Sequence, residues 1–366
     1  MFWKDKRVFV TGHTGFKGSW LSLWLCELGA RVKGFALEPP TTPSLFVVSE
    51  VAHGLQSVTG DINDFSQLQR ELHEQRPEIV FHLAAQPLVR ASYEDPLGTF
   101  QANVMGTANL LEAVRTCGSV RAVVVITTDK CYENREWAWP YRETDVLGGH
   151  DPYSSSKACA ELVVSAFRKS YFSADTYDRH GVCLASARAG NVIGGGDWAR
   201  DRLIPDIIRA FSDGQPVEIR NPASVRPWQH VLEPLRGYLM LAEQLYGGRT
   251  DLATAWNFGP NISDAKPVEW IVTAASKFWG QGASWTSAHT GDIHEAQVLK
   301  LDWSKAAQEL RWTPALTLEE ALKLTLSWYK CFDAGKSMRT ISLAQLSSYA
   351  SQAGYYSEPI EVGQEY

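Results

Sequence analysis

The sequence lacks the features that mark disulfide-rich, zinc-binding and nucleic-acid-binding proteins. Only six of its 366 residues are cysteines, and they are scattered without a CxxC pair, at positions 26, 117, 131, 159, 183 and 331. This spacing is typical of reduced thiols in the cytoplasm, and it predicts neither a disulfide framework nor a metal site. The formal net charge is −6 and no basic cluster offsets it, so we expect no nucleic-acid partner.

Long apolar runs are absent as well. No stretch approaches the roughly 18 uncharged apolar residues that a membrane-spanning helix needs. The N-terminal sequence MFWKDKRVFVTG leads directly into a strand-like run and contains no apolar leader with a cleavage site. We therefore expect a cytoplasmic protein that has no membrane partner.

The first half of the chain contains an alternation of strand-like and helix-like segments. Helical patterns at 18–28, 65–75, 96–116 and 152–171 separate short apolar runs at 7–11, 31–37, 78–84, 120–127 and 182–187. Parallel strands need crossover helices between them, and strands that are apolar throughout are buried on both faces. This order therefore predicts an α/β fold with a doubly wound parallel sheet.

The alternation ends near residue 190. The glycine-rich segment GNVIGGGDWARDRLIPD (190–206) is followed by helical patterns near 267–279 and 318–330, which predict a smaller, mostly helical C-terminal lobe. The run HVLEPLRGYLMLAEQL (230–245) predicts a helix that returns to the main sheet. The predicted division of the chain is a sheet domain at 1–190 with a returning segment at about 228–260, a lobe at 191–227 and 261–335, and a tail at 336–366.

Three glycines stand between the first predicted strand and the first helix, in VFVTGHTGFKGSWL: Gly12, Gly15 and Gly18. Glycine at these positions permits a tight turn and lets the backbone approach a pyrophosphate at the helix N-terminus, so the motif predicts a dinucleotide site. We predict NAD because Glu38 lies just beyond the second strand, and the loop that follows contains no cation for a 2′-phosphate. Lys17, within the glycine loop, is the only basic candidate nearby.

A tyrosine and a lysine four residues apart begin a predicted helix in DPYSSSKACAE: Tyr153 and Lys157. This spacing places both side chains on one face of the helix, where the ammonium would lower the pKa of the phenol toward the range of a general base. Thr128 and Asp129 follow the apolar run at 120–127, at the end of a predicted strand. The pair alone also fits a surface tyrosine beside a solvated lysine, but together with the glycine loop it favours a proton-transfer site.

These motifs resemble the extended short-chain dehydrogenase/reductases, whose signature is TGxxGxxG followed by YxxxK. More narrowly, the chain resembles the nucleotide-sugar 4,6-dehydratases, most closely those that act on CDP-glucose. This closer resemblance is carried by the segments HTGFKGSWL (13–21), HLAAQPLVRASYEDP (82–96), TTDKCYEN (127–134), GGGDWARDRLIPD (194–206) and RNPASVRPWQHVLEPL (220–235).

The resemblance implies an NAD-binding Rossmann domain at 1–190 and a nucleotide-sugar-binding lobe. It also implies a reaction that oxidises the sugar at carbon 4, eliminates water across carbons 5 and 6, and returns the same hydride to carbon 6. The product of CDP-D-glucose would be CDP-4-dehydro-6-deoxy-D-glucose, and NAD would stay tightly bound and be recycled in each turnover. The products of this family are usually precursors for bacterial deoxysugar synthesis, including the deoxysugars of the lipopolysaccharide O-antigen.

On this resemblance, Tyr153 removes the proton of the carbon-4 hydroxyl, and Lys157 binds the nicotinamide ribose and tunes the phenol. Thr128 would hydrogen-bond the carbon-4 oxygen. Asp129 would donate a proton to the departing carbon-6 hydroxyl. General acid or base help of this kind accelerates a reaction by about 10²- to 10⁴-fold.

Lys130 departs from the related dTDP-glucose enzymes, in which a glutamate at this position takes the carbon-5 proton. A lysine can take that proton only when it is neutral, which requires a pKa lowered from about 10.4 toward 7 by burial and neighbouring positive charge. Alternatively, Lys130 stays charged and stabilises the enolate while another group or water accepts the proton.

The resemblance also assigns binding residues. The NAD residues are Gly12, His13, Thr14, Gly15, Phe16, Lys17, Gly18, Asp61, Ile62, Leu83, Ala84, Ala85 and Thr127, together with Tyr153 and Lys157. The nucleotide-sugar residues are Asn191, Trp198, Arg202, Leu203 and Arg226. A guanidinium fork suits a phosphate, although Arg226 could instead bridge carboxylates, and Ala84 and Ala85 could serve only strand-end packing.

Two other functions fit part of the pattern. A nucleotide-sugar 4-epimerase would share the fold, the cofactor, the tyrosine and the lysine, but it expels no hydroxyl and has no use for an acid at Asp129. A non-catalytic cofactor-sensing protein would keep the glycine loop but can lose the Tyr153–Lys157 pair. The resemblance further implies that the amphipathic helices predicted at 96–116 and 152–171 pair across an interface as a four-helix bundle, in a homodimer or homotetramer.

Overall fold

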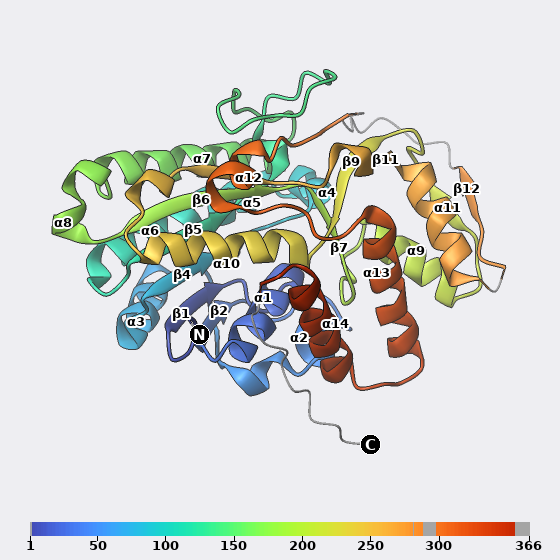
Figure 1. The fold of residues 1–366 in the computed structure, drawn as a ribbon, viewed down its shortest axis with the longest axis horizontal. Helices are drawn as coiled ribbons and strands as arrows, with labels where there is room; N and C mark the ends of the chain where they lie inside the picture. The colour runs from blue at the N-terminus through green and yellow to red at the C-terminus, as the bar shows by residue number, and fades with distance from the viewer. Residues whose placement is uncertain (1, 281, 288–297, 356–366) are drawn as a thin grey trace.

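The computed structural model describes residues 2–280, 282–287 and 298–355, and in this part of the chain a seven-stranded sheet forms the centre (Figure 1). The strand order is β10-β6-β5-β4-β1-β2-β3, and every neighbouring pair is parallel. The strands are β1 (Arg7–Thr11), β2 (Arg31–Ala36), β3 (Gln56–Thr59), β4 (Ile79–His82), β5 (Ala122–Ile126), β6 (Cys183–Ala189) and β10 (Ala255–Phe258). The predicted doubly wound parallel sheet is confirmed.

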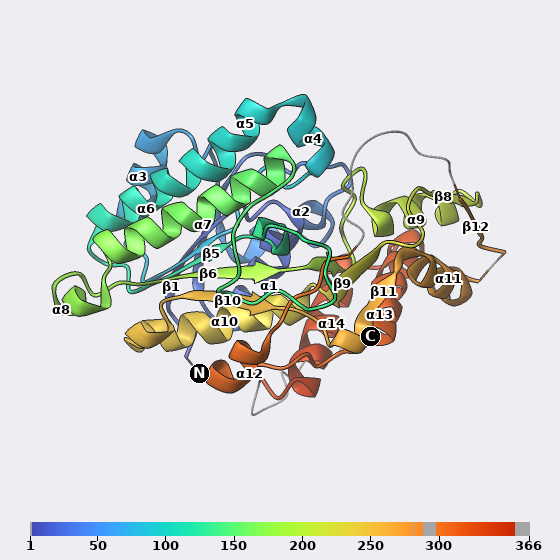
Figure 2. The same cartoon turned by 90° about the horizontal axis from the view of Figure 1, so that it is seen from above.

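Helices cover both faces of the sheet because successive strand residues point to opposite sides. Val8 and Val10 of β1 belong to the apolar core on one face, whereas Phe9 belongs to the core on the other. Figure 2 shows helices covering the second face and α10 lying on the opposite side. The helices that carry these two cores are α1 (Phe16–Glu27) and α10 (Leu232–Tyr246) on one face, and α3 (Phe65–Gln75), α6 (Gly106–Cys117) and α7 (Pro152–Ser170) on the other.

The helix predicted at 96–116 is interrupted. It consists of α5 (Pro96–Phe100), a π-helical turn η2 (Gln101–Met105) and α6. Asn103 in the π turn is buried, donates hydrogen bonds to Gln86 O at 3.1 Å and Ser156 Oγ at 2.8 Å, and accepts one from Gln86 N at 2.8 Å. The wider turn therefore places an amide between the chain that leaves β4 and helix α7.

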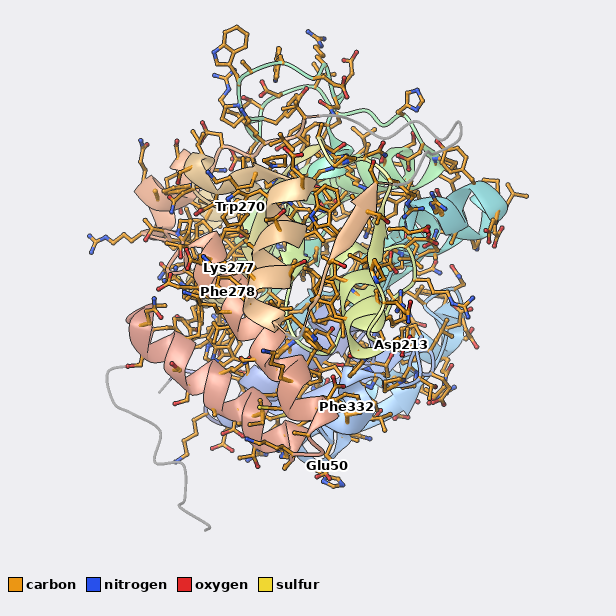
Figure 3. The ribbon with its side chains drawn as sticks, turned by 90° about the vertical axis from the view of Figure 1, so that its right-hand side faces the viewer. Glu50, Asp213, Trp270, Lys277, Phe278 and Phe332 are labelled. Atoms are coloured by element: carbon orange, nitrogen blue, oxygen red, sulfur yellow. The ribbon has the colours of Figure 1, made fainter. Side chains whose placement is uncertain are left out.

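The lobe combines helices with two small sheets that the sequence did not predict. One sheet has the order β11-β9-β7 and the other pairs β12 with β8. Figure 3 looks onto this side of the molecule, where Trp270, Lys277 and Phe278 lie along α11. The lobe elements are β7 (Asn191–Ile193), α9 (Leu203–Ser212), β8 (Val217–Ile219), β9 (Val225–His230), β11 (Ala265–Pro267), α11 (Val268–Trp279), β12 (Trp285–Ser287) and α13 (Leu318–Asp333).

The sequence predicted no element after residue 335, but Met338–Gln352 form helix α14, which packs near α1 and α13. Tyr349 of α14 donates a hydrogen bond to Glu233 Oε2 at 2.8 Å and accepts one from Arg236 Nε at 3.1 Å, both residues of α10. The rest of the predicted tail, 356–366, lies outside the described residues. The remaining short helices are α2 (Leu45–Val48), α4 (Val89–Glu94), α8 (Tyr177–His180) and α12 (Ser304–Leu310).

Candidate active site

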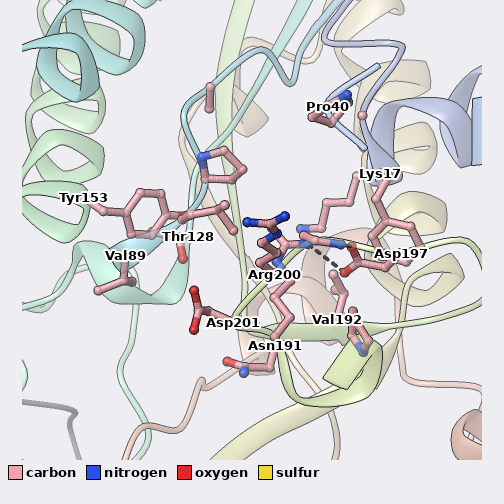
Figure 4. A pocket seen from close by; sticks show the side chains of 18 of the residues that line it. Lys17, Pro40, Val89, Thr128, Tyr153, Asn191, Val192, Asp197, Arg200 and Asp201 are labelled. Atoms are coloured by element: carbon pink, nitrogen blue, oxygen red, sulfur yellow. Dashed lines mark hydrogen bonds and ion pairs between the residues drawn. The ribbon is translucent and has the colours of Figure 1, made fainter. Parts of the chain in front are cut away.

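A cavity of about 2080 Å³ lies between the carboxyl ends of the sheet strands and the lobe (Figure 4). Ligands bind at this edge of open parallel sheets because the loops that leave the strands diverge there. Every residue predicted for the site except His13 lines the cavity, although these residues come from both halves of the chain. Among the residues that the structure describes, no group of three or more His, Cys, Asp or Glu side chains could hold a metal ion.

The side chain of His13 packs beneath the glycine loop and does not line the cavity. It is fully buried, its Nε2 lies 2.7 Å from Ser57 Oγ, and its ring stands edge-on to Phe46. Burial lowers the pKa of His13 to about 4, so the imidazole is neutral at physiological pH. The side chain of His13 therefore packs in the core, and its predicted role in binding NAD through that side chain has no support from its position.

The glycine loop is packed so closely that side chains do not fit at two of its positions. A Cβ at Gly12, which has a φ of +77°, would lie 2.6 Å from Ala84 N, and a Cβ at Gly18 would lie 2.0 Å from Gly12 O. Gly15 caps the N-terminus of α1 and lines the cavity. The loop therefore presents bare backbone and a helix N-terminus to the cavity, which fits a pyrophosphate.

The end of the cavity beside β2 and β3 carries a carboxylate. Glu38 Oε1 accepts a hydrogen bond from Thr59 Oγ1 at 2.9 Å, and Asp61 follows on the next turn. The lining residues between 35 and 63, all of them described, include no lysine or arginine. A ribose with free hydroxyls fits this end, whereas a 2′-phosphate would meet negative charge without a counter-ion.

Lys17 points away from that end. It is half-buried, and its Nζ donates to Tyr238 OH at 3.5 Å. Burial lowers the pKa of Lys17 to about 7; the positive Arg202 and Lys157 act in the same direction, and Asp129 opposes them. The single cation of the glycine loop is therefore near Asp129 and Lys157 and does not serve the end beside β2 and β3.

The turn after β5 brings Thr128, Asp129 and Lys130 to the cavity. Thr128 accepts a hydrogen bond from Lys130 N at 3.4 Å, and so begins the 3₁₀ turn η3 (Asp129–Cys131). Its hydroxyl also donates to Asp129 Oδ1 at 3.1 Å. Asp129 is 2% exposed, and its Oδ2 has no hydrogen-bond partner among the described residues. Burial raises the pKa of Asp129 although Lys130 opposes this, which suits a group that donates a proton.

Helix α7 presents Tyr153 and Lys157 because it begins at Pro152. Asp151 caps it by accepting hydrogen bonds from Ser154 N at 2.9 Å and Ser154 Oγ at 2.6 Å, so Tyr153 falls in the first turn. The ring of Tyr153 points toward Thr128 (Figure 4), whose hydroxyl lowers the pKa of the phenol. Lys157 is buried, and its Nζ donates to Ile126 O at 3.4 Å.

The lowered tyrosine pKa that the spacing predicted is not observed. Burial raises the pKa of Tyr153 to about 12, because the cost of desolvating a phenolate outweighs the hydrogen bond from Thr128. Burial also lowers the pKa of Lys157 to about 8, against the opposing effect of Glu161. Ionising Tyr153 near neutral pH therefore needs positive charge beyond that of the described residues.

The lobe lines the other wall of the cavity. Arg202 Nη1 lies 2.8 Å from Asp197 Oδ2, and Leu203 begins α9 directly after it. Arg226 also lines the cavity, and its positive charge lowers the pKa of the Asp129 carboxyl. Trp198 packs edge-on against Trp328, with ring centres 5.6 Å apart, so it serves the lobe core as well as the cavity wall.

Among the cavity residues that were not predicted, three charged side chains form one cluster. Asp201 Oδ1 lies 3.3 Å from both Arg90 Nη1 of α4 and Arg220 Nη1 of the lobe, and all three residues line the cavity. The carboxylate thus joins the two walls. Arg90 and Arg220 each lie in a segment that carried the family resemblance, and this was the signal in the sequence that could have identified them. Their pairing with Asp201 could not be predicted, because it depends on the fold.

The family model described as GDP-mannose 4,6 dehydratase matches residues 9–325. CDP-glucose 4,6-dehydratase of Salmonella typhimurium strain LT2 is 57% identical over 350 residues, covering 96% of this chain and 98% of the relative.

Two solved structures show the same fold. DesIV, a dTDP-glucose 4,6-dehydratase from Streptomyces venezuelae with NAD and TYD bound, matches with a TM-score of 0.75 at 24% identity, covering 91% of this chain and 99% of that one. UDP-glucose 4-epimerase of Thermotoga maritima also matches with a TM-score of 0.75 at 24% identity, covering 89% and 99%. Because a dehydratase and an epimerase match equally well, the fold does not decide between these two reactions.

Proposed function

Because the chain belongs to the family of GDP-mannose 4,6-dehydratases, we propose that it converts CDP-D-glucose to CDP-4-dehydro-6-deoxy-D-glucose and water, for deoxysugar synthesis. The identity of 57% over 96% of the chain to a CDP-glucose 4,6-dehydratase supports this substrate. The observation that favours a dehydratase over an epimerase is the buried Asp129 beside Thr128 and Tyr153, since only an elimination needs an acid at that position.

The proposed cofactor is NAD, held by the glycine loop, the turn at Asp61 and the strand end at 83–85. The chemistry that bound NAD would supply is hydride transfer, as acceptor from carbon 4 and donor to carbon 6, with no net change in its oxidation state after each turnover. The carboxylate of Glu38 and the absence of a cation between lining residues 35 and 63 support NAD over its 2′-phosphorylated form.

The proposed proton transfers use four side chains. Tyr153 takes the proton of the carbon-4 hydroxyl while Thr128 hydrogen-bonds the same oxygen. Lys157 binds the nicotinamide ribose, and its charge favours the phenolate. Asp129 donates its proton to the carbon-6 oxygen as the bond to carbon 6 breaks, and its raised pKa keeps that proton available to higher pH. We assign the binding of the substrate pyrophosphate to Arg202 and Arg226, which both line the cavity.

Deuterated substrate tests the reaction. CDP-glucose carrying deuterium at carbon 4 is supplied without added cofactor, and the product is examined by mass spectrometry and NMR. We expect deuterium in the new methyl group. Deuterium retained at carbon 4 of a galactose isomer would indicate the epimerase, and the absence of turnover with any nucleotide sugar would indicate a cofactor-sensing protein.

We expect Lys130→Met to leave oxidation at carbon 4 intact but to stop solvent deuterium from entering carbon 5. Lys130 lines the cavity beside Asp129 and is half-buried, so its side chain can reach the substrate. Proton NMR of the nucleotide sugar recovered after incubation in D₂O measures the exchange. Normal exchange in this variant would exclude Lys130 as the base and as an essential stabiliser of the enolate.

The variant Lys130→Arg separates the two roles that remain open for Lys130. Arginine keeps the positive charge but does not deprotonate in proteins. If Lys130 is the base, Lys130→Arg will lose exchange as fully as Lys130→Met. If Lys130 stabilises the enolate by its charge, the arginine variant will keep exchange at carbon 5.

We further propose a homodimer formed through α5, η2 and α7, in a reducing cytoplasm. These elements pack side by side and expose apolar side chains: Leu97 is 82% exposed, Leu162 is 58% exposed and Met105 is 48% exposed. A second copy of the chain, contributing the same helices, would cover them as a four-helix bundle. All six cysteines are free, which fits a reducing compartment.

We expect Leu162→Lys to convert the assembly to monomers, because a charge would then have to be buried in the interface. Light scattering after size-exclusion chromatography measures the mass. The matched control is Ile262→Lys, which places the same charge at a 63% exposed apolar position outside these helices and should leave the mass unchanged. An unchanged mass for both variants would count against this interface.

A further inference from the structure

A buried carboxylate lies directly behind the proposed catalytic residues. Glu161 of α7 is 3% exposed, and its Oε2 lies 2.8 Å from Nη2 of Arg188, a residue of β6 that is equally buried. The same oxygen accepts a hydrogen bond from Ser186 Oγ at 2.7 Å, and Oε1 accepts one from the hydroxyl of Thr127. One side chain therefore joins α7 to the ends of both β5 and β6.

The position of Glu161 relates it to both catalytic segments. Tyr153, Lys157 and Glu161 are spaced by four residues and so lie along one face of α7. Thr127 directly precedes Thr128, so the hydrogen bond from Thr127 fixes the start of the catalytic turn. Arg188 continues the network, because its Nη1 donates to Tyr132 OH at 2.7 Å beyond that turn.

The charged and titratable groups near Lys157 come from several elements. Glu161 on its own helix and Cys131 of η3 favour its charged form, whereas Lys17 of α1 and His82 of β4 repel it when they are charged. Burial raises the pKa of Cys131 and lowers that of His82 to about 3, so both are neutral near pH 7. Burial opposes the ionisation of Glu161, but Arg188 and the hydroxyls of Thr127 and Ser186 lower the pKa of its carboxyl. Of the groups that favour charged Lys157, Glu161 therefore carries the full negative charge.

We propose that Glu161 is a positioning residue, which keeps Lys157 protonated for the cofactor while it holds the strand end that carries Thr128 and Asp129. This role rests on the proposed function, in which Lys157 binds the nicotinamide ribose. A neutral Lys157 would lose its attraction for the phenolate of Tyr153, and its hydrogen bonds to the ribose would weaken.

The test removes both buried charges, in Glu161→Gln/Arg188→Met, since removing one alone would leave the other unpaired. The dissociation constant of NAD and the turnover of CDP-glucose are measured from about pH 6 to pH 10. We expect the alkaline limb of both profiles, where Lys157 loses its proton, to move to lower pH by about one unit or more. A limb that stays at the wild-type pH in this variant would overturn the proposal.

The matched control is Lys33→Met/Glu71→Gln. This pair is also largely buried, with Lys33 Nζ 2.7 Å from Glu71 Oε2, but it joins β2 to α3 away from the cavity. This control variant should lower the free energy of unfolding but leave the alkaline limbs of the NAD-affinity and turnover profiles at the wild-type pH. If the methionine variant does not fold, Glu161→Gln/Arg188→Gln keeps a polar pair in place and provides the same test.

Failure of this proposal is distinguishable from failure of the proposed function. If the wild type does not convert CDP-glucose, the proposed function fails, while the pH dependence of NAD affinity still tests Glu161. If Lys157→Met keeps wild-type NAD affinity and turnover, the role of Lys157 is wrong, and the role of Glu161 fails with it. If the wild type is active and Lys157→Met is impaired, but the alkaline limb of Glu161→Gln/Arg188→Met stays at the wild-type pH, only the role of Glu161 is excluded.

Discussion

Replacement of Tyr153 by phenylalanine will lower the turnover of CDP-glucose by about 10²- to 10⁴-fold, the loss expected for a general base. The substitution removes the hydroxyl that faces Thr128 but keeps the aromatic ring, which is 8% exposed, so the helix and the cavity wall stay in place. Rapid mixing with substrate, followed by the absorbance of reduced nicotinamide, measures oxidation at carbon 4 directly. CDP-glucose binding, measured by calorimetry, should remain within a few-fold of the wild type.

Tyr93→Phe provides the matched control for Tyr153→Phe. Tyr93 lies on α4, is 45% exposed and does not line the cavity, so loss of its hydroxyl should leave turnover unchanged. If Tyr153→Phe oxidises carbon 4 at a rate close to that of the wild type, Tyr153 is not the base, and Thr128 or water must accept the proton.

The second large effect concerns stability. Arg188→Met will lower the free energy of unfolding by about 3–5 kcal/mol, because it leaves the buried carboxylate of Glu161 without its counter-ion. Urea denaturation at a fixed pH near 7 measures the loss. Adding Glu161→Gln to Arg188→Met should recover most of it, since no unpaired charge then remains buried. Equal instability of the single and double variants would show that packing of the arginine matters more than its charge.

The effect of pH on the free energy of unfolding should have opposite signs in the wild type and in Arg188→Met. In the wild type the folded-state pKa of Glu161 is lowered, so its contribution is present above the unfolded-state value of about 4.3 and is lost as pH falls through the folded-state value. In Arg188→Met, burial without the guanidinium raises the folded-state pKa, so stability is lost as pH rises above about 4.3. The difference in the free energy of unfolding between the wild type and Arg188→Met should therefore decrease as the pH is lowered. Urea denaturation at several pH values measures this difference.

The sequence alone determined most of the central sheet, although β3 was not predicted, and it determined the parts of the site that depend on local spacing. Strands that are buried on both faces are apolar throughout, so β1 and β5 were visible as short apolar runs bounded by helical patterns. Residues four apart on a helix are neighbours whatever the rest of the chain does, and this relation predicted that Tyr153 and Lys157 act together. The strands of the lobe were not predicted, since three residues, as in β7 and β8, are too few for an alternating pattern.

Only the tertiary structure decided the contacts between segments that are distant in the chain. It directed Lys17 toward Asp129 and away from the end of the cavity beside β2 and β3. It also placed Asp201 between two arginines on opposite walls of the cavity. It also paired Glu161 with Arg188, which is 27 positions away along the chain. Such pairings depend on how strands and helices stack, and burial then sets the pKa of each group by removing water. For that reason the sequence predicted which residues form the site but not their charge states.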